Sequence, residues 1–117
     1  MSLGHKRYLS MMKYSSGLVG NSSSGLIEAA VLKKGAVNIG IRQKGRVRGE
    51  NVIDCGNSAD EIKEAVTMLF SAGFKKCLET AGSPYGDGHS AEKIVKVLKE
   101  TDLKGIQIKR FYDLERQ

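Results

Sequence analysis

Two groups of side chains suited to binding phosphate lie close together in the sequence. The first is a serine-rich turn at residues 20–25, Gly-Asn-Ser-Ser-Ser-Gly, which follows a short apolar segment and precedes a helical pattern from about Ser24. The start of a helix leaves about four backbone N–H groups without a partner and carries roughly half a positive charge. The turn is therefore a candidate anion site, to which the serine hydroxyls would add hydrogen-bond donors.

The second group is a basic loop that follows the next apolar segment and contains Arg42, Arg46 and Arg48. A guanidinium group is planar and can bind two phosphate oxygens at once. A serine-lined helix start that faces an arginine loop suits the diphosphate of a nucleotide.

A purely structural explanation of the serine turn stands beside this hypothesis. Serine-glycine runs are typical of flexible turns, and a serine before a helix is typical of an N-cap. The run is not a Walker A loop, because no Gly-Lys-Ser/Thr follows at the required spacing, and it is not a GxGxxG motif. The pattern alone leaves both explanations open.

The two groups need a scaffold, and strand and helix patterns alternate along the chain. Strands are expected at residues 18–19, 36–39 and 52–55. Helices are expected at residues 6–14, 24–33, 59–70, 74–78 and from 89 to about 101. This alternation predicts an α/β fold with a small parallel sheet flanked by helices. Ligands of such sheets bind at the carboxyl ends of strands, where both groups of phosphate-binding candidates lie.

Several other conspicuous residues are expected to be structural. Ser58 and Glu61 have the spacing of a capping box, and Asn38 is expected to make a structural hydrogen bond within its strand. Cys55 and Cys77 lie far apart, which favours free, buried thiols and a reducing cytoplasm. The helix after the capping box has the clearest apolar period of the chain, formed by Ile62, Ala65, Val66, Leu69 and Phe70.

Composition restricts the function further. The 117 residues predict one domain, and the net charge of +6 comes from basic residues spread along the chain. With few aromatic residues and no known nucleic-acid motif, we do not expect nucleic-acid binding. No apolar run is long enough to cross a membrane, and no cluster of metal ligands is visible, so we expect a cytoplasmic protein without metal or cofactor. The last apolar residues are expected to form a tail helix or an extended strap: Ile106, Ile108, Phe111 and Tyr112.

Three short strands make a thin parallel sheet, whereas parallel strands are normally found in larger sheets covered on both faces. We therefore interpret residues 1–117 as the latter part of a larger domain. An open sheet edge could pair with the missing part or with a second copy of the chain.

The sequence also resembles a known family. The runs G-N-S-S-S-G-L-I-E-A, V-N-I-G-x-R-Q-x-G-R, N-V-I and P-Y-G-D-G resemble, in this order, the C-terminal end of UDP-N-acetylglucosamine 2-epimerases over roughly residues 8–99. The hydrolysing branch, which makes N-acetylmannosamine and UDP for sialic acid synthesis, is the better match. The non-hydrolysing branch has D-S-G-G at the serine turn and T-E-R-P in the arginine loop.

The resemblance implies a partial Rossmann-like domain, the C-terminal half of a GT-B type domain, with UDP-sugar bound between two domains. It implies that Ser22 and Ser23 hold the UDP diphosphate and that Arg42 lines the UDP pocket. Glu28 would hold the ribose hydroxyls, just over one turn beyond Ser23 on the same expected helix. Further candidates for the UDP pocket are Asn21, Ser24 and Arg46.

The function implied is the UDP-binding portion of a hydrolysing UDP-N-acetylglucosamine 2-epimerase, inactive by itself. No residue is an evident general base for the C2 proton of the sugar, and His89 is not expected to be catalytic. Glu50 and Asn51 are expected to shape their loop, and the Tyr-Gly-Asp-Gly run at residues 85–88 to form a tight turn. Two alternatives are a stand-alone module that binds a nucleotide or a partner, and part of an epimerase for a related UDP-sugar such as a bacillosamine derivative.

Overall fold

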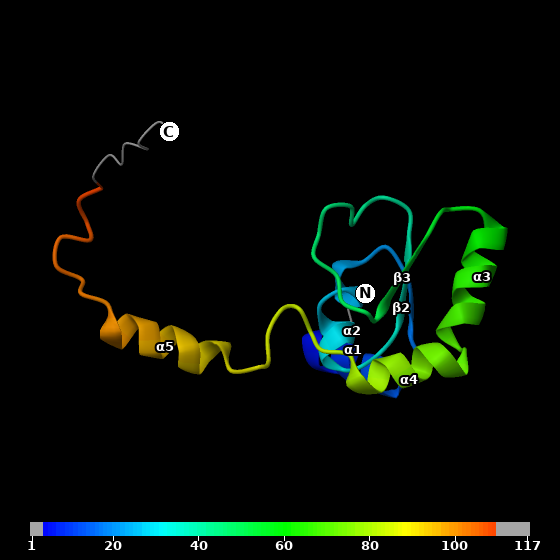
Figure 1. Ribbon diagram of the computed structural model, residues 1–117, viewed down its shortest axis with the longest axis horizontal. Helices are drawn as coiled ribbons and strands as arrows, with labels where there is room; N and C mark the ends of the chain where they lie inside the picture. Colours follow the sequence, from blue (N-terminus) through cyan, green and yellow to red (C-terminus); the bar gives the residue numbers. More distant parts are fainter. Residues whose placement is uncertain (1–3, 110–117) are drawn as a thin grey trace. The chain divides into compact units, whose positions relative to one another are not determined.

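The computed structural model describes residues 4–109. The chain divides into two compact units, Met1–Asp87 and Gly88–Gln117. Each unit is described by itself. The first contains a small parallel sheet with helices on both faces, which confirms the predicted α/β class (Figure 1). Its elements in chain order are α1 (His5–Tyr14), β1 (Leu18–Gly20), the 3-10 turn η1 (Ser23–Gly25), α2 (Glu28–Val31), β2 (Ala36–Ile39), β3 (Val52–Cys55), α3 (Ala59–Leu69) and α4 (Ala72–Thr80).

The sheet has the strand order β1-β2-β3, and both strand pairs are parallel. Val37 in the central strand lies opposite Val19 on one side and Ile53 on the other. All three strands occur where the sequence predicts them, because each is a short run of β-branched or apolar residues between glycine-rich turns. β1 and β3 are the edge strands of the sheet. Because β1 and β2 are adjacent and parallel, the turns that follow them lie side by side.

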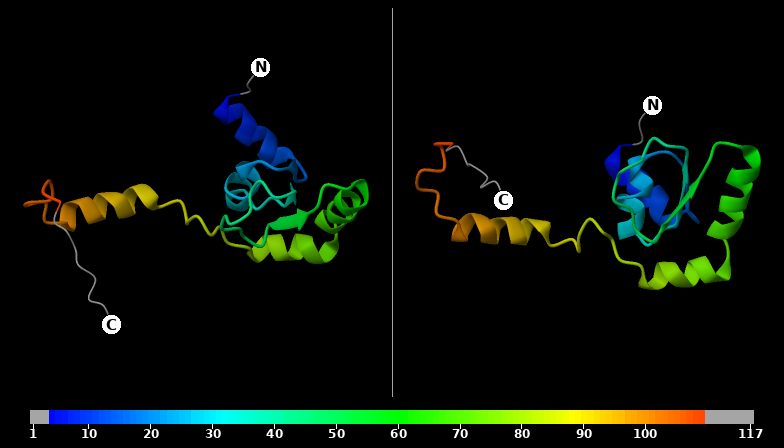
Figure 2. Two further views of the ribbon diagram at one scale, coloured as in Figure 1. Left: turned by 90° about the horizontal axis from the view of Figure 1, so that it is seen from above. Right: turned by 45° about the horizontal axis from the view of Figure 1, so that its top comes forward.

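The residues of the central strand alternate between two apolar layers, as the pleat of a strand requires. Ala36 packs with Met12 of α1 and Ala29 of α2. Val37 packs with Ala65 and Leu69 of α3 on the opposite face. The views of Figures 1 and 2 show the same arrangement, with α1 and α2 on one side of the strands and α3 on the other.

Two glycines allow these layers to approach the sheet. A Cβ atom on Gly25 would lie 3.0 Å from the Cβ of Ala36, so η1 rests directly on β2. A Cβ atom on Gly35 would lie 2.4 Å from Leu69 Cδ1 and 2.6 Å from Phe74 Cε1. Side chains from α3 and α4 therefore fill the space that a larger residue before β2 would need.

The expected helix over residues 24–33 is wrong in its extent. The chain forms η1 and then the four-residue helix α2, with a turn between them. The carbonyl of Gly25 accepts a hydrogen bond from Asn51 Nδ2 at 3.0 Å, and glycine is itself a weak helix former. Lys33 then adopts φ 52°, a left-handed conformation that ends the helical segment.

The α3–α4 region differs from expectation in one packing detail. Phe70, expected on the apolar face of the helix, is 50% exposed. Phe74 packs against the Val37 cluster, and its helix α4 extends well beyond the single turn expected. Ser71 starts α4 by accepting a hydrogen bond from Phe74 N at 3.2 Å.

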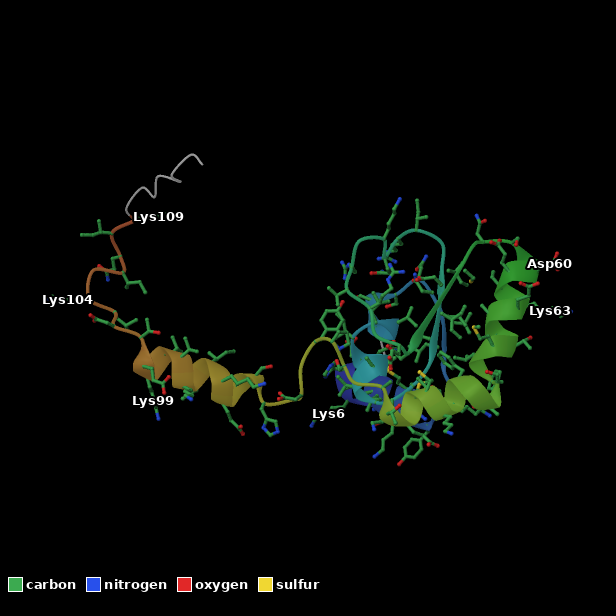
Figure 3. The ribbon with its side chains drawn as sticks, in the orientation of Figure 1. Lys6, Asp60, Lys63, Lys99, Lys104 and Lys109 are labelled. Carbon is green, nitrogen blue, oxygen red and sulfur yellow. The ribbon has the colours of Figure 1, made fainter. Side chains whose placement is uncertain are left out.

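The capping box at the start of α3 is confirmed. Ser58 Oγ accepts from Glu61 N at 3.3 Å, and a carboxylate oxygen of Glu61 accepts from Ser58 N at 3.2 Å. The Ser58 hydroxyl also donates to the Glu61 carboxylate. This hydrogen bond first of all, and then the one from Ser58 N, lower the pKa of Glu61. Asp60 and Lys63 of the same helix point outward, away from the sheet (Figure 3).

We therefore expect the start of α3 to be acid-sensitive. The pKa of Glu61 is lower in the folded chain, so its stabilising effect is complete above the ordinary glutamate pKa and is lost as the pH falls through the lowered pKa. Thermal unfolding from pH 7 to pH 3 should show a smaller acid-induced drop in Tm for Glu61→Gln than for the parent chain. Glu64→Gln, an exposed change on the same helix, should keep the parent's pH profile; equal profiles for all three proteins would contradict the prediction.

The second unit contains α5 (Ser90–Glu100), which confirms the helix expected there. His89 precedes it, and its Nδ1 lies 3.0 Å from a carboxylate oxygen of Glu92. Ile106 and Ile108 lie in a turn region rather than in the expected tail helix or strap. Phe111 and Tyr112, expected in the same segment, lie outside the described residues. No helix within residues 4–109 is long and apolar enough to cross a membrane.

Candidate functional site

The serine turn and the arginine loop meet at the carboxyl edge of the sheet, as predicted. The turn follows β1 and the loop follows the parallel neighbour β2. Arg42 donates a hydrogen bond from Nη1 to Asn21 Oδ1 at 3.3 Å. Gln43 donates from Nε2 to the carbonyl oxygen of Asn21 at 2.7 Å. The two groups of candidate ligands therefore form one continuous surface.

The serine turn is shaped by its own hydrogen bonds. Ser22 has extended backbone angles and caps η1, and its Oγ accepts from Ser24 N at 3.3 Å. The N-cap explanation is thus correct for Ser22. Because η1 is a single 3-10 turn, the expected dipole of a long helix is absent at this point, and anion binding would depend on the serine hydroxyls and the local N–H groups. Ser22 is exposed, whereas Ser23 and Ser24 are half-buried.

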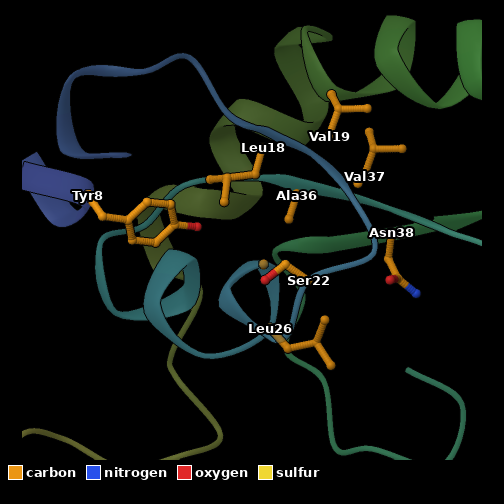
Figure 4. Close-up of a pocket in the computed structure, with 10 residues that line it drawn as sticks. Tyr8, Leu18, Val19, Ser22, Leu26, Ala36, Val37 and Asn38 are labelled. Atoms are coloured by element: carbon orange, nitrogen blue, oxygen red, sulfur yellow. The ribbon is translucent and has the colours of Figure 1, made fainter. Parts of the chain in front are cut away.

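A small cavity of about 160 Å³ lies beside the turn. Figure 4 shows Tyr8 of α1, Ser22 of the turn and Asn38 of β2 around it, with apolar side chains between them. Pockets for small-molecule ligands typically measure about 300–1,000 Å³. The cavity is smaller than this range, so it does not by itself enclose a whole nucleotide.

Glu28 is the first residue of α2 and is half-buried. The expectation that it continues one helix from Ser23 is wrong, because a turn separates η1 from α2. Among the residues that the structure describes, the Glu28 carboxylate has no hydrogen-bond or ion-pair partner. It is therefore free to accept hydrogen bonds from a ligand.

The arginines of the loop have different roles. Arg48 pairs with Asp54 and donates from Nη2 to the carbonyl oxygen of Gln43 at 2.8 Å, so its guanidinium is fixed within the protein. Asp54 also accepts from Asn38 Nδ2 at 2.7 Å, which confirms the structural role predicted for Asn38. Arg42 and Arg46 are exposed and remain available to an anion. Of the three arginines expected to be available to a phosphate, Arg48 is therefore excluded, and Arg42 and Arg46 remain candidates.

Two buried amide side chains bond to backbone carbonyls at opposite ends of the strands. Asn51, 1% exposed, precedes β3 and donates from Nδ2 to the carbonyl oxygens of Gly25 at 3.0 Å and Lys34 at 3.2 Å. Its side chain is therefore structural, but it holds segments outside the loop that it was expected to shape. Gln43, 3% exposed, was missed by sequence reasoning. Its only signal is a neutral amide in an otherwise basic loop.

A tight turn before the second unit contacts the arginine loop. It lies at residues 83–86, where Gly86 N donates to Ser83 O at 3.3 Å, two residues earlier than the turn expected at residues 85–88. The hydroxyl of Tyr85 donates to the carbonyl oxygen of Val47 in the middle of the loop. This segment therefore contributes to the site indirectly, by fixing the loop that carries Arg42.

Both cysteines are free, as predicted, but they are half-buried rather than buried. Burial raises the pKa of the Cys55 thiol, and the nearby carboxylates of Glu61 and Asp54 raise it further. A thiol with a raised pKa is protonated at neutral pH and is a poor nucleophile. Among the described residues, no group of three or more His, Cys, Asp or Glu side chains could hold a metal ion.

Known proteins identify the family. The family model for UDP-N-acetylglucosamine 2-epimerase matches residues 1–99. The chain belongs to this epimerase family. As a family member it is 39% identical over 115 residues to the polysialic acid biosynthesis protein P7 of Escherichia coli, a match that covers 97% of the chain and 29% of that protein.

Two hydrolysing epimerases are also similar to this family member. It is 41% identical over 114 residues to the GDP/UDP-N,N'-diacetylbacillosamine 2-epimerase of Campylobacter jejuni, covering 97% of the chain and 29% of that protein. It is 37% identical over 101 residues to the UDP-N,N'-diacetylbacillosamine 2-epimerase of Legionella pneumophila, covering 86% of the chain and 26% of that protein. The chain thus spans less than a third of the length of these epimerases.

Proposed function

We propose that this chain is the UDP-binding portion of a hydrolysing UDP-N-acetylglucosamine 2-epimerase, which converts UDP-N-acetylglucosamine and water to N-acetylmannosamine and UDP. The observation that carries the proposal is the contact of Arg42 with Asn21, which brings an exposed guanidinium to the hydroxyl-rich turn. Family membership supports a UDP-sugar as the ligand.

The residues divide into three roles. Ser22 and Ser23 bind the diphosphate through their hydroxyls and the N–H groups of the turn, and Arg42 neutralises part of its charge. Glu28, which has no partner among the described residues, accepts hydrogen bonds from the ribose hydroxyls. The remainder of the UDP pocket is formed by Asn21, Ser24 and Arg46.

This arrangement would assist the departure of UDP. Cleavage of the bond between the sugar and the diphosphate develops negative charge on the leaving group, and fixed donors that face this charge lower the barrier. The reaction also needs a general base within hydrogen-bond reach of the C2 proton. We assign no residue of this chain to that role, and we place the base in the part of the epimerase outside this sequence. The chain alone should bind UDP without turnover.

A second candidate substrate is UDP-N,N'-diacetylbacillosamine, because two similar proteins carry this sugar in their names. Both substrates share UDP, so the roles proposed for this chain would be the same. β1 and β3 are both edge strands of the sheet in the described residues, and such an edge can pair with another chain. The rest of the epimerase, or a second copy of the chain, is therefore the expected protein partner in the cytoplasm.

The direct test is a calorimetric titration of UDP into the chain and into its Ser23→Ala variant. Loss of one hydrogen bond to the charged diphosphate should weaken binding by about tenfold, the equivalent of about 1.4 kcal/mol. Ser90→Ala, at the exposed start of α5, is the matched control and should bind like the parent chain. Absence of UDP binding by the parent chain at millimolar concentration, or equal affinity of parent and Ser23→Ala, would refute the proposed role.

A further inference from the structure

The contact between the serine turn and the arginine loop depends on one buried side chain. Gln43 is 3% exposed although its neighbours Arg42 and Lys44 are exposed. Its Nε2 donates to the carbonyl oxygen of Asn21 at 2.7 Å, a shorter contact than the 3.3 Å between Arg42 Nη1 and Asn21 Oδ1. The buried amide is therefore the firmer of the two links between turn and loop.

The orientation of this amide is determined by its partner. The carbonyl oxygen of Asn21 can only accept, so the Gln43 nitrogen must face it. The other amide atom, Gln43 Oε1, is buried and has no partner among the described residues. A buried acceptor without a partner is unfavourable. Packing alone would favour an apolar residue at this position, so the amide is explained by its contact with the turn.

The main chain of Gln43 is fixed as well. Its carbonyl oxygen accepts from Arg48 Nη2 at 2.8 Å, and Arg48 pairs with Asp54 in β3. Asp54 accepts in turn from Asn38 Nδ2 in β2 at 2.7 Å. The backbone of Gln43 is thus linked through Arg48 and Asp54 to β3 and β2. Its side chain is linked to the turn after β1.

We infer that Gln43 is a positioning residue of the proposed UDP site: its carboxamide holds the serine turn against the arginine loop, so that both are in place before the diphosphate binds. The inference rests on the proposed function. A ligand bound by two separate loops must otherwise order both of them on binding, which weakens affinity. Gln43 lowers that cost without itself touching the ligand, because its side chain is buried.

Gln43→Met tests this role, because methionine has a similar length and volume but no donor. UDP binding should weaken by about three- to tenfold, as expected for the loss of one buried hydrogen bond. The loss should shrink to less than twofold in the Arg42→Ala background, since positioning Arg42 has no value once its guanidinium is gone. A residue that only supports the fold would weaken binding equally in both backgrounds, so equal losses overturn the inference.

A second measurement uses the parent chain and does not depend on the folding of a variant. Hydrogen exchange of the Gln43 side-chain amide should be slow before UDP is added, compared with that of the exposed Gln107 side chain. Exchange at the rate of Gln107 would show that the link to Asn21 is not formed, which overturns the inference.

The failure of the inference and that of the proposed function are distinguishable. If the parent chain binds no UDP, both fall. If it binds UDP through Arg42, and Gln43→Met binds equally well, only the positioning role of Gln43 is wrong.

Discussion

Replacing Arg42 with alanine is expected to weaken UDP binding by about 10- to 150-fold, the equivalent of about 1.5–3 kcal/mol for a hydrogen bond to a charged group. Arg42 is exposed, and its Nη1 lies 3.3 Å from Asn21 Oδ1, so its guanidinium is oriented toward the serine turn. Within residues 4–109 no carboxylate pairs with it. Arg48, by contrast, is paired with Asp54. Calorimetric titration of UDP into parent and variant measures the loss.

Two further variants separate geometry from charge. Lys44→Ala removes one positive charge from the same loop at an exposed position and should change UDP affinity by less than about twofold at physiological salt. Arg42→Lys keeps the charge but removes the planar pair of donors, so its affinity should lie between those of the parent and Arg42→Ala. Equal losses in Lys44→Ala and Arg42→Ala would mean that binding reflects overall charge rather than a built site.

The largest effect on stability is expected at Asn51. This side chain is 1% exposed and donates to two carbonyl oxygens, those of Gly25 and Lys34. Asn51→Ala would leave both without this donor and would open a small cavity, so the free energy of unfolding should fall by about 2–4 kcal/mol. Urea unfolding followed by circular dichroism measures this change.

Two further variants test whether the donated hydrogen bonds of Asn51 account for this loss of stability. Asn51→Asp has nearly the same shape but no donor, so it should destabilise the chain at least as much as Asn51→Ala at neutral pH. Asn57→Ala, an exposed asparagine in the turn before α3, should change the free energy of unfolding by less than about 0.5 kcal/mol. A stable Asn51→Asp variant would show that volume, rather than the donated hydrogen bonds, accounts for the burial of Asn51.

The parts of the fold that follow from local chemistry could be predicted from the sequence. The three strands are short apolar runs between turns, and the capping box of Ser58 and Glu61 needs only residues three apart. The proximity of the serine turn and the arginine loop follows from the geometry of parallel strands. These features need no information about distant side chains.

The parts that could not be predicted depend on partners far away in the sequence. Asn51 bonds to the Gly25 carbonyl, in the segment expected to form a regular helix. Arg48 and Arg42 are indistinguishable by composition, and only the position of Asp54 shows which of them is available to an anion. Gln43 is likewise recognisable only once the Asn21 carbonyl is seen beside it.

The way in which the arginine loop is anchored has a consequence for its length. Surface loops usually accept insertions and deletions readily. This one is tied at Gln43 to the turn after β1, at Arg48 to β3, and at Val47 to the hydroxyl of Tyr85. One residue inserted between Gln43 and Arg48 would displace at least one of these two side chains from its partner. The spacing of these residues should therefore be as strictly constrained as that within a strand, although the loop has no regular secondary structure.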